Sequence, residues 1–334
     1  MYAQSHEGRS FVTDAVLGRA DAEDRKNREL QEDSMRDLEI KRILVPTDLS
    51  EQSIVSLQYA RFFAERFSSS LTLLYVDPLV FPISDAGADI PLYIATTPAH
   101  IAKLEKEVRV YADAALLGYP YDVAAAVGEP VPAIVREEQE RAADLVIMAT
   151  HGLRGWRRLV LGSVTEGVLR GGDSPVLSVS RSGERLRTPD PVKKILCPIN
   201  FTETARASLE YASHLAATFD CELIVVHVVE EDAKTKPVAA GGIRSWIDPA
   251  IQNRCTFREI VQRGGAAERV LDCAEDLGAD LIVIGAQHKR FRDETVIGTT
   301  TERLVRFARV PVLSVPRRVE VKKTHEEALA AHVY

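Results

Sequence analysis

Short apolar runs alternate along this chain with longer amphipathic stretches. In the first half of the chain the apolar runs lie at 43–45, 71–76, 122–127, 145–148 and 176–179. Amphipathic stretches such as 53–67 and 99–117 separate them. Nearly continuous apolar strands that alternate with helices are typical of a parallel sheet covered on both faces. The pattern therefore predicts an α/β domain with a five-stranded, doubly wound parallel sheet.

The same pattern occurs a second time in the same register. Ile43-Leu-Val-Pro-Thr-Asp48 is matched by Ile195-Leu-Cys-Pro-Ile-Asn200, and Gly162-Ser163 is matched by Gly298-Thr299. An Ala-Asp-Leu segment and a Pro-Val-Leu-Ser-Val segment recur at the same offset. A repeat decides the architecture, so we predict two tandem domains of one fold.

The repeat divides the chain into five segments. These are a charged N-terminal extension at 1–40, a first domain at 41–180, a linker at 181–191, a second domain at 192–316 and a charged C-terminal tail at 317–334. The first domain carries extra residues from about Pro78 to Ala99, which we predict to be a long surface excursion.

The last strand of each domain is predicted to lie at a sheet edge. The strands 176–179 and 312–315 both have high β propensity, and an unprotected edge invites pairing. A tandem chain offers an internal partner for each edge. We therefore predict an intramolecular pseudo-dimer, the alternative being two independent domains on a linker.

Composition narrows the classes of partner. A net charge of −7 argues against broad attraction to nucleic acid or to anionic lipid, and no apolar run has the length of a membrane span. We expect a cytoplasmic protein without nucleic-acid or membrane partners. The four cysteines all lie in the second repeat without a Cys-x-x-Cys pair. A metal site from Cys197, His227 and Cys255 is conceivable, but free cysteine is more often a small buried hydrophobe.

A glycine-bounded loop follows the fourth predicted strand. Gly152, nine intervening residues and Gly162-Ser163 precede a predicted helix at 164–170. Glycine lets the backbone approach a phosphate, and a helix N-terminus offers free N–H groups. Ser163 with Glu166 also has the form of a capping box, which needs no ligand. Both interpretations are compatible, because one helix end has several unpaired N–H groups.

Other polar residues near this loop have two interpretations each. Asp48 could accept a ribose hydroxyl, or it could cap the following helix, a role that Asn200 fills equally well in the second repeat. His151 has no visible catalytic partner. The arginines of the loop could meet phosphates or be solvated, and these are Arg154, Arg157 and Arg158.

The first repeat, read as Ala149-x₂-Gly152-x₉-Gly162-Ser163, resembles the universal stress protein family, and specifically its tandem members. Nucleotide-binding members carry Gly-x₂-Gly-x₉-Gly-(Ser/Thr), so this chain departs at the first glycine only. The resemblance implies an adenine-nucleotide alpha-hydrolase-like fold that binds ATP or AMP, either with or without Mg²⁺. By resemblance Asp48 holds the ribose, Val76 and Met148 flank the adenine, and the glycine loop cradles the phosphates. The candidate nucleotide-binding residues are Pro46, Thr47, Asp48, Val76, Met148, Ala149, His151, Gly152, Gly162, Ser163, Val164 and Thr165.

The second repeat departs further from that motif. It is Gly285-x₂-His288-x₉-Gly298-Thr299, with Ile199-Asn200 in place of Thr47-Asp48. A left-handed backbone at His288 would cost about 1–2 kcal/mol. Our hypothesis is one competent site in the first repeat and one degenerate copy.

The resemblance implies a regulatory protein of the stress response rather than a metabolic enzyme. We expect a nucleotide-controlled surface that an unidentified protein partner recognises, and two tandem chains could pair further as a homodimer. The alternatives are a slow ATPase and a nucleotide-free structural or adaptor protein. The chain lacks a P-loop motif, and we assign neither a catalytic residue nor a metal ligand.

Overall fold

The computed structural model describes residues 38–78, 97–150, 161–180, 191–230, 242–247, 249–286, 288–291 and 294–316. The chain divides into two units, Met1–Leu38 and Glu39–Tyr334, and both repeats belong to the second. The predicted extension, linker and tail lie almost wholly outside the described residues. So does most of the predicted excursion, although Pro98 and Ala99 already belong to a helix.

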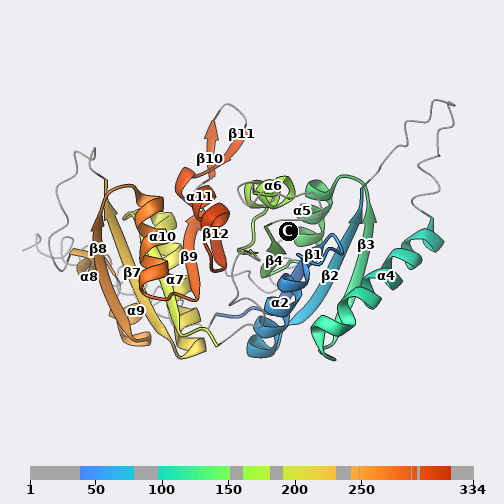
Figure 1. Cartoon of the computed structure of the whole chain (residues 1–334), viewed down its shortest axis with the longest axis horizontal. Coiled ribbons are helices and arrows are strands. Elements are labelled where there is room, and N and C mark those ends of the chain that lie inside the picture. Colours follow the sequence, from blue (N-terminus) through green and yellow to red (C-terminus); the bar gives the residue numbers. More distant parts are fainter. Residues whose placement is uncertain are drawn as a thin grey trace, which may run out of the picture. The chain divides into compact units, whose positions relative to one another are not determined.

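The first repeat alternates strands and helices as predicted. Its elements are β1 (Arg42–Thr47), α2 (Ile54–Phe67), β2 (Ser70–Asp77), α4 (Pro98–Leu116), β3 (Tyr121–Val127), α5 (Pro130–Glu140), β4 (Leu145–Ala149), α6 (Ser163–Gly171) and β5 (Val176–Val179). Helices α2 and α4 pack on one face of the sheet, and α5 and α6 pack on the other (Figure 1). No helix within the described ranges is both long enough and apolar enough to cross a membrane.

The second repeat follows the same order with two differences. Its elements are β6 (Lys194–Ile199), α7 (Glu203–Phe219), β7 (Glu222–Val229), α8 (Gly242–Trp246), α9 (Pro249–Arg254), β8 (Phe257–Arg263), α10 (Ala266–Asp276), β9 (Leu281–Ala286), β10 (His288–Phe291), β11 (Glu294–Ile297), α11 (Thr299–Phe307) and β12 (Val312–Pro316). Two short helices, α8 and α9, stand where the first repeat has the long helix α4. The hairpin β10–β11 was not predicted from the sequence.

The two repeats share one ten-stranded sheet, in the order β3-β2-β1-β4-β5-β12-β9-β6-β7-β8. Pairing within each repeat is parallel, whereas β5 pairs with β12 antiparallel, with Leu177 opposite Leu313. Each repeat contributes five strands, as predicted, and the predicted edge pairing is confirmed. The alternative of two independent domains is wrong, because the junction is a continuous backbone ladder.

An aspartate sets the strand register in each repeat. The Asp144 carboxylate accepts hydrogen bonds from the backbone N–H groups of Lys41 and Arg42, at 3.0 and 2.9 Å, and from the Arg42 guanidinium. Asp280 accepts the equivalent bonds from Lys193 and Lys194, at 2.8 and 3.0 Å. Hydrogen bonds to a charged acceptor are the stronger kind. These bonds tie the start of β1 to β4, and the start of β6 to β9.

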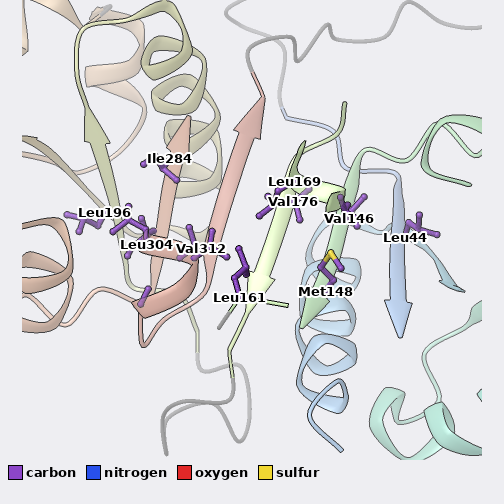
Figure 2. Packing of buried hydrophobic residues seen from close by; sticks show 14 of the residues in the cluster. Leu44, Val146, Met148, Leu161, Leu169, Val176, Leu196, Ile284, Leu304 and Val312 are labelled. Atoms are coloured by element: carbon purple, nitrogen blue, oxygen red, sulfur yellow. The ribbon is translucent and has the colours of Figure 1, made fainter. Parts of the chain in front are cut away.

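One apolar core runs through the junction of the repeats. Val176 of β5 and Val312 of β12 are 2% and 1% exposed, and they belong to one buried cluster with Leu169 and Leu304 from the helices α6 and α11 (Figure 2). The cluster extends to Leu44 in the first repeat and to Leu196 in the second. The junction is therefore packed like the interior of a domain.

On the opposite face of the sheet, α2 and α7 meet through aromatic rings. The Phe219 ring of α7 lies 5.5 Å from Phe62 and from Phe63, and 6.0 Å from Phe67, measured between ring centroids. Stacked and edge-to-face geometries of this kind add to the free energy of simple burial. Arg66 of α2 also donates a hydrogen bond to the Thr218 carbonyl of α7.

We predict that Phe219→Ala lowers the free energy of unfolding by about 2–3 kcal/mol, because three aromatic partners lose a packed ring. The control is Phe307→Ala, since the Phe307 side chain is 41% exposed. Urea titration followed by circular dichroism measures both variants. Equal midpoints for the two variants would contradict a role for the Phe219 cluster in holding the repeats together.

Candidate functional site

The carboxyl ends of β1, β2 and β4 lie at one edge of the first repeat, because these strands are parallel neighbours. Ligands of doubly wound sheets bind outside this edge. Pro46 and Thr47 end β1, and Asp48 follows them. Val76 is the penultimate residue of β2, and Met148 is the penultimate residue of β4. The structure therefore brings these five predicted residues to the same edge, whereas His151 and Gly152 lie outside the described residues.

The loop after β1 is held by its own side chains. The Thr47 hydroxyl accepts a hydrogen bond from the Leu49 N–H at 3.1 Å and shares another, also at 3.1 Å, with the Ser53 hydroxyl. Asp48 Oδ1 accepts a hydrogen bond from the Ser50 N–H at 3.1 Å. Leu49 takes a left-handed conformation with φ of 60°. These bonds fix the direction of the half-buried Asp48 carboxylate.

Asp48 is not the cap of the following helix. The N-cap residue of α2 is Ser53, and in the second repeat the N-cap residue of α7 is Thr202, whose hydroxyl accepts a hydrogen bond from the Ala205 N–H. The capping interpretation of Asp48 and Asn200 is therefore wrong. Asn200 instead accepts a hydrogen bond from the Thr202 hydroxyl at 2.7 Å.

Gly162 forms the other side of the edge, at the start of α6. Its N–H donates to the Thr150 carbonyl at 2.9 Å, and a Cβ at this position would lie 2.8 Å from the same oxygen. No larger residue fits without moving the backbone. Thr165 Oγ1 donates to the Ala149 carbonyl at 2.9 Å, which anchors the first turn of α6 to the end of β4.

The predicted capping box at Ser163 is not formed. The N-cap residue is Gly162, which has no side chain, and Glu166 pairs with Arg170 instead. Ser163 is exposed at the first helical position, followed by the half-buried Val164. The N-terminus of α6 therefore has no side-chain cap, a state that favours an anionic ligand by the helix dipole and the unpaired N–H groups.

Ala149 replaces the first motif glycine, and the equivalent Gly285 shows what a side chain at this position would contact. In the second repeat, a Cβ on Gly285 would lie 2.6 Å from the Thr204 carbonyl in the first turn of α7. The residue of the first repeat that corresponds to Thr204 is Gln52, which lies in a turn before α2 begins. Because α2 starts later than α7, the segment that would crowd a side chain at Gly285 corresponds to a turn in the first repeat, which carries the larger Ala149.

The corresponding edge of the second repeat is packed with aromatic side chains. Phe201, which matches Leu49 and is also left-handed with φ of 58°, lies 4.6 Å from the His227 ring and 5.3 Å from Trp246. The Arg206 guanidinium stands 4.6 Å from the centre of the Trp246 ring. His227 Nδ1 lies 3.0 Å from the Ile199 carbonyl, which accepts its hydrogen bond.

The nine-residue loop of the second repeat forms the hairpin β10–β11. His288 pairs with Ile297, and Phe291 pairs with Glu294, in an antiparallel ladder. Strand β11 contacts α6 of the first repeat. His288, which stands at the position of the motif glycine Gly152, is therefore paired in a strand.

The three residues considered for a metal site do not converge. Cys255 lies before the amino-terminal end of β8, whereas His227 lies near the carboxyl end of β7. Cys197 is fully buried in β6, and burial raises the pKa of its thiol to about 12, against the lowering effect of a hydrogen bond with Ser208. Within the described ranges no three metal-ligating side chains gather.

Comparison with known proteins gives a consistent result. A family model described as "Universal stress protein family" matches residues 39–180, 191–243 and 250–316. Universal stress proteins MJ0577 and MJ0531 of Methanocaldococcus jannaschii are 27% and 30% identical over 155 and 142 residues, each 42% of this chain and respectively 95% and 82% of the relative. The crystal structure of a universal stress protein from Archaeoglobus fulgidus superposes with a TM-score of 0.67 at 25% identity, covering 84% of this chain and all of the other.

We predict that Gly162→Ala destabilises the protein by about 1–3 kcal/mol, because the added Cβ meets the Thr150 carbonyl and the start of α6 must shift. Gly171→Ala, at the last residue of the same helix, is the control. Its Cβ would lie 3.5 Å from Val135, an ordinary contact, so its stability should stay within about 1 kcal/mol of the wild type. Thermal unfolding compares the two variants, and equal shifts would contradict the close approach at Gly162.

Proposed function

Since this chain belongs to the universal stress protein family, we propose that it is a regulatory protein of the stress response that binds one adenine nucleotide, ATP or AMP, in its first repeat. The observation that carries the proposal is the difference between the two sheet edges. The edge of the first repeat combines an oriented carboxylate with an uncapped helix N-terminus. The edge of the second repeat is filled by its own side chains.

The phosphates would lie at the start of α6. Gly162 brings the chain close to Thr150 without a side chain in the way, and the exposed Ser163 hydroxyl stands at the first helical position. The N–H groups of Ser163, Val164 and Thr165 belong to the first turn, where they have no partners within the helix. Backbone donors and the helix dipole together favour a phosphate group there. Mg²⁺ would accompany the phosphates as part of the nucleotide.

The nucleoside would lie at the ends of β1, β2 and β4. Asp48 is half-buried and presents a carboxylate, which accepts hydrogen bonds from hydroxyl groups such as those of ribose. Val76 and Met148 are 8% and 4% exposed and offer the apolar surface that an adenine ring requires. Ala149 lies between this surface and the phosphate end.

The second repeat keeps an uncapped helix N-terminus at Gly298, before α11, but it lacks the other features. Ile199 stands in place of the hydroxyl of Thr47, and Asn200 lacks the charge of Asp48. The rings of Phe201, His227 and Trp246 occupy the edge where a nucleoside would enter. The second repeat is therefore proposed to be a structural copy, whose sheet completes that of the first.

Calorimetric titration with ATP and Mg²⁺, and separately with AMP, tests the proposal. We expect one site per chain in protein stripped of nucleotide. Asp48→Ala should weaken binding roughly tenfold or more, because a charged acceptor of the ribose is lost. Asn200→Ala is the matched control and should bind as tightly as the wild type.

Each alternative gives a different titration. Two sites per chain, or an equal loss in the Asn200→Ala variant, would exclude the single-site arrangement. The absence of any heat with either nucleotide would favour a nucleotide-free adaptor. Release of phosphate from bound ATP on the time scale of minutes would favour a slow ATPase.

The two tryptophans of the chain allow the site to be located independently. Trp156 lies in the sequence between Gly152 and Gly162, whereas Trp246 packs on Phe201 in the second repeat. We expect ATP to change the fluorescence of the Trp246→Phe variant, which retains Trp156. The Trp156→Phe variant, which retains Trp246, should show no change. A response from Trp246 alone would assign the nucleotide to the second repeat.

A further inference from the structure

A tyrosine from the helix α4 reaches the loop after β1, which no motif in the sequence indicates. The Tyr111 hydroxyl lies 2.7 Å from Ser53 Oγ and donates to the Ser50 carbonyl at 2.8 Å. These two serines lie in the loop that carries Asp48 and enters α2. The contact spans two segments far apart in the sequence, and it joins α4 to the candidate site.

Ser53 is the centre of this network. Besides the Tyr111 hydroxyl, its own hydroxyl contacts Thr47 Oγ1 at 3.1 Å and donates to the Ser50 carbonyl at 2.9 Å. Ser50 in turn donates its N–H to Asp48 Oδ1 at 3.1 Å. A continuous path of hydrogen bonds therefore runs from Tyr111 through the serines to the Asp48 carboxylate. Ser50 and Ser53 are 2% and 3% exposed, so water does not replace these bonds easily.

We propose that Tyr111 is a positioning residue for the nucleotide, which holds the Asp48 carboxylate in the direction that receives the ribose. This role rests on the proposed function and adds a residue that lies outside the binding motif. Hydrogen bonds that share donors and acceptors in a buried network strengthen one another, so the loss of one member loosens the others. The left-handed Leu49 within this loop costs free energy, and it persists only because the surrounding bonds fix it.

The ionisation behaviour of Tyr111 is consistent with a permanent donor. Burial raises the pKa of its hydroxyl, hydrogen bonds with Ser53 and Thr47 lower it, and the Asp48 carboxylate raises it again. The phenol therefore remains protonated at neutral pH and donates to the Ser50 carbonyl.

The described part of the second repeat contains no equivalent of this network. Ala205 stands in place of Ser53 and has no hydroxyl, and the short helices α8 and α9 replace α4. Its loop after β6 is held instead by the Thr202 hydroxyl and by the contact of Phe201 with Trp246. The tyrosine network therefore belongs to the repeat with the proposed nucleotide site.

Tyr119 provides a matched control in the same repeat. Its hydroxyl donates to the Ala64 and Ser69 carbonyls, at 3.0 and 2.7 Å, at the opposite end of α2. Tyr111→Phe and Tyr119→Phe each remove one phenol hydroxyl that bonds to backbone carbonyls. Their effects on stability should be similar, but only Tyr111 lies at the edge that carries Asp48.

The test compares the affinities for ATP and for 2′,3′-dideoxy-ATP, which lacks both ribose hydroxyls. In the wild type we expect ATP to bind roughly tenfold more tightly than the dideoxy analogue. A hydrogen bond from a ribose hydroxyl to a carboxylate contributes about this much to the affinity. In Tyr111→Phe this ratio should fall to about threefold or less, and Ser53→Ala should reduce it likewise. Tyr119→Phe should retain the wild-type ratio. The ratio is insensitive to a general loss of stability, which weakens both ligands equally.

A Tyr111→Phe variant with the wild-type ratio would overturn the positioning role, and so would an equal fall of the ratio in Tyr119→Phe. If the wild type binds neither nucleotide, the proposed function itself fails and the role of Tyr111 falls with it. If the wild type binds both analogues equally, the nucleotide site stands but Asp48 does not hold the ribose, which also overturns the positioning role.

Discussion

A five-stranded parallel sheet leaves unpaired N–H and C=O groups on both edge strands, and in this chain the pairing of β5 with β12 removes one edge from each repeat. The rest of the arrangement follows from that ladder. Val176 and Val312 are brought together on one face of the sheet, where they join the apolar cores of both repeats. On the other face the ladder sets α2 beside α7, so that Phe219 meets the aromatic rings of α2.

The two repeats share this sheet but differ at positions where two neighbouring residues change size together. The buried Glu138 accepts hydrogen bonds from the Asp173 and Ser174 N–H groups, at 2.9 and 2.6 Å, and a Cβ on Gly172 would lie 2.5 Å from its second carboxylate oxygen. In the second repeat both corresponding residues are alanines, Ala274 and Ala308. Ala149 and Gly285 are a second such pair of positions. The glycine occurs in the repeat whose neighbouring helix, α7, begins earlier, and the alanine occurs in the repeat whose helix, α2, begins later.

The sequence predicted the fold because the fold depends on periodic features. Alternating apolar runs and helices, repeated in register, are sufficient to indicate two doubly wound domains, and the β propensity of 312–315 indicated the junction. The bonds of single side chains were harder to predict. Aspartate is a common N-cap residue, but the turn at 51–53 makes Ser53 the N-cap of α2. Asp48 instead accepts a hydrogen bond from the Ser50 N–H. Ser163 and Glu166 have the spacing of a capping box, but the helix begins one residue too early for it, with Gly162 as the N-cap.

Side-chain contacts between distant segments were not predictable from local patterns. Tyr111 is a half-buried residue of the amphipathic helix α4. Its hydrogen bond with Ser53 depends on how α4 packs against α2. The hairpin β10–β11 lies in a segment whose length between His288 and Gly298 does not by itself indicate strands. A single chain without aligned relatives gives no covariation between such positions, which is the signal that reports a contact directly.

Ligand binding and complete packing make opposite demands on the same sheet edge. A binding edge must keep donors and acceptors without protein partners, and this lowers stability until a ligand supplies the bonds. An edge filled with its own aromatic rings gains that stability at once. In the second repeat Phe201, His227 and Trp246 provide it, with Arg206 placed over the indole. In the first repeat the hydrogen bonds of Tyr111 and Ser53 hold the loop that carries Asp48. Under the proposed function, the packed second repeat stabilises, through the shared sheet, the frame on which a nucleotide-binding first repeat depends.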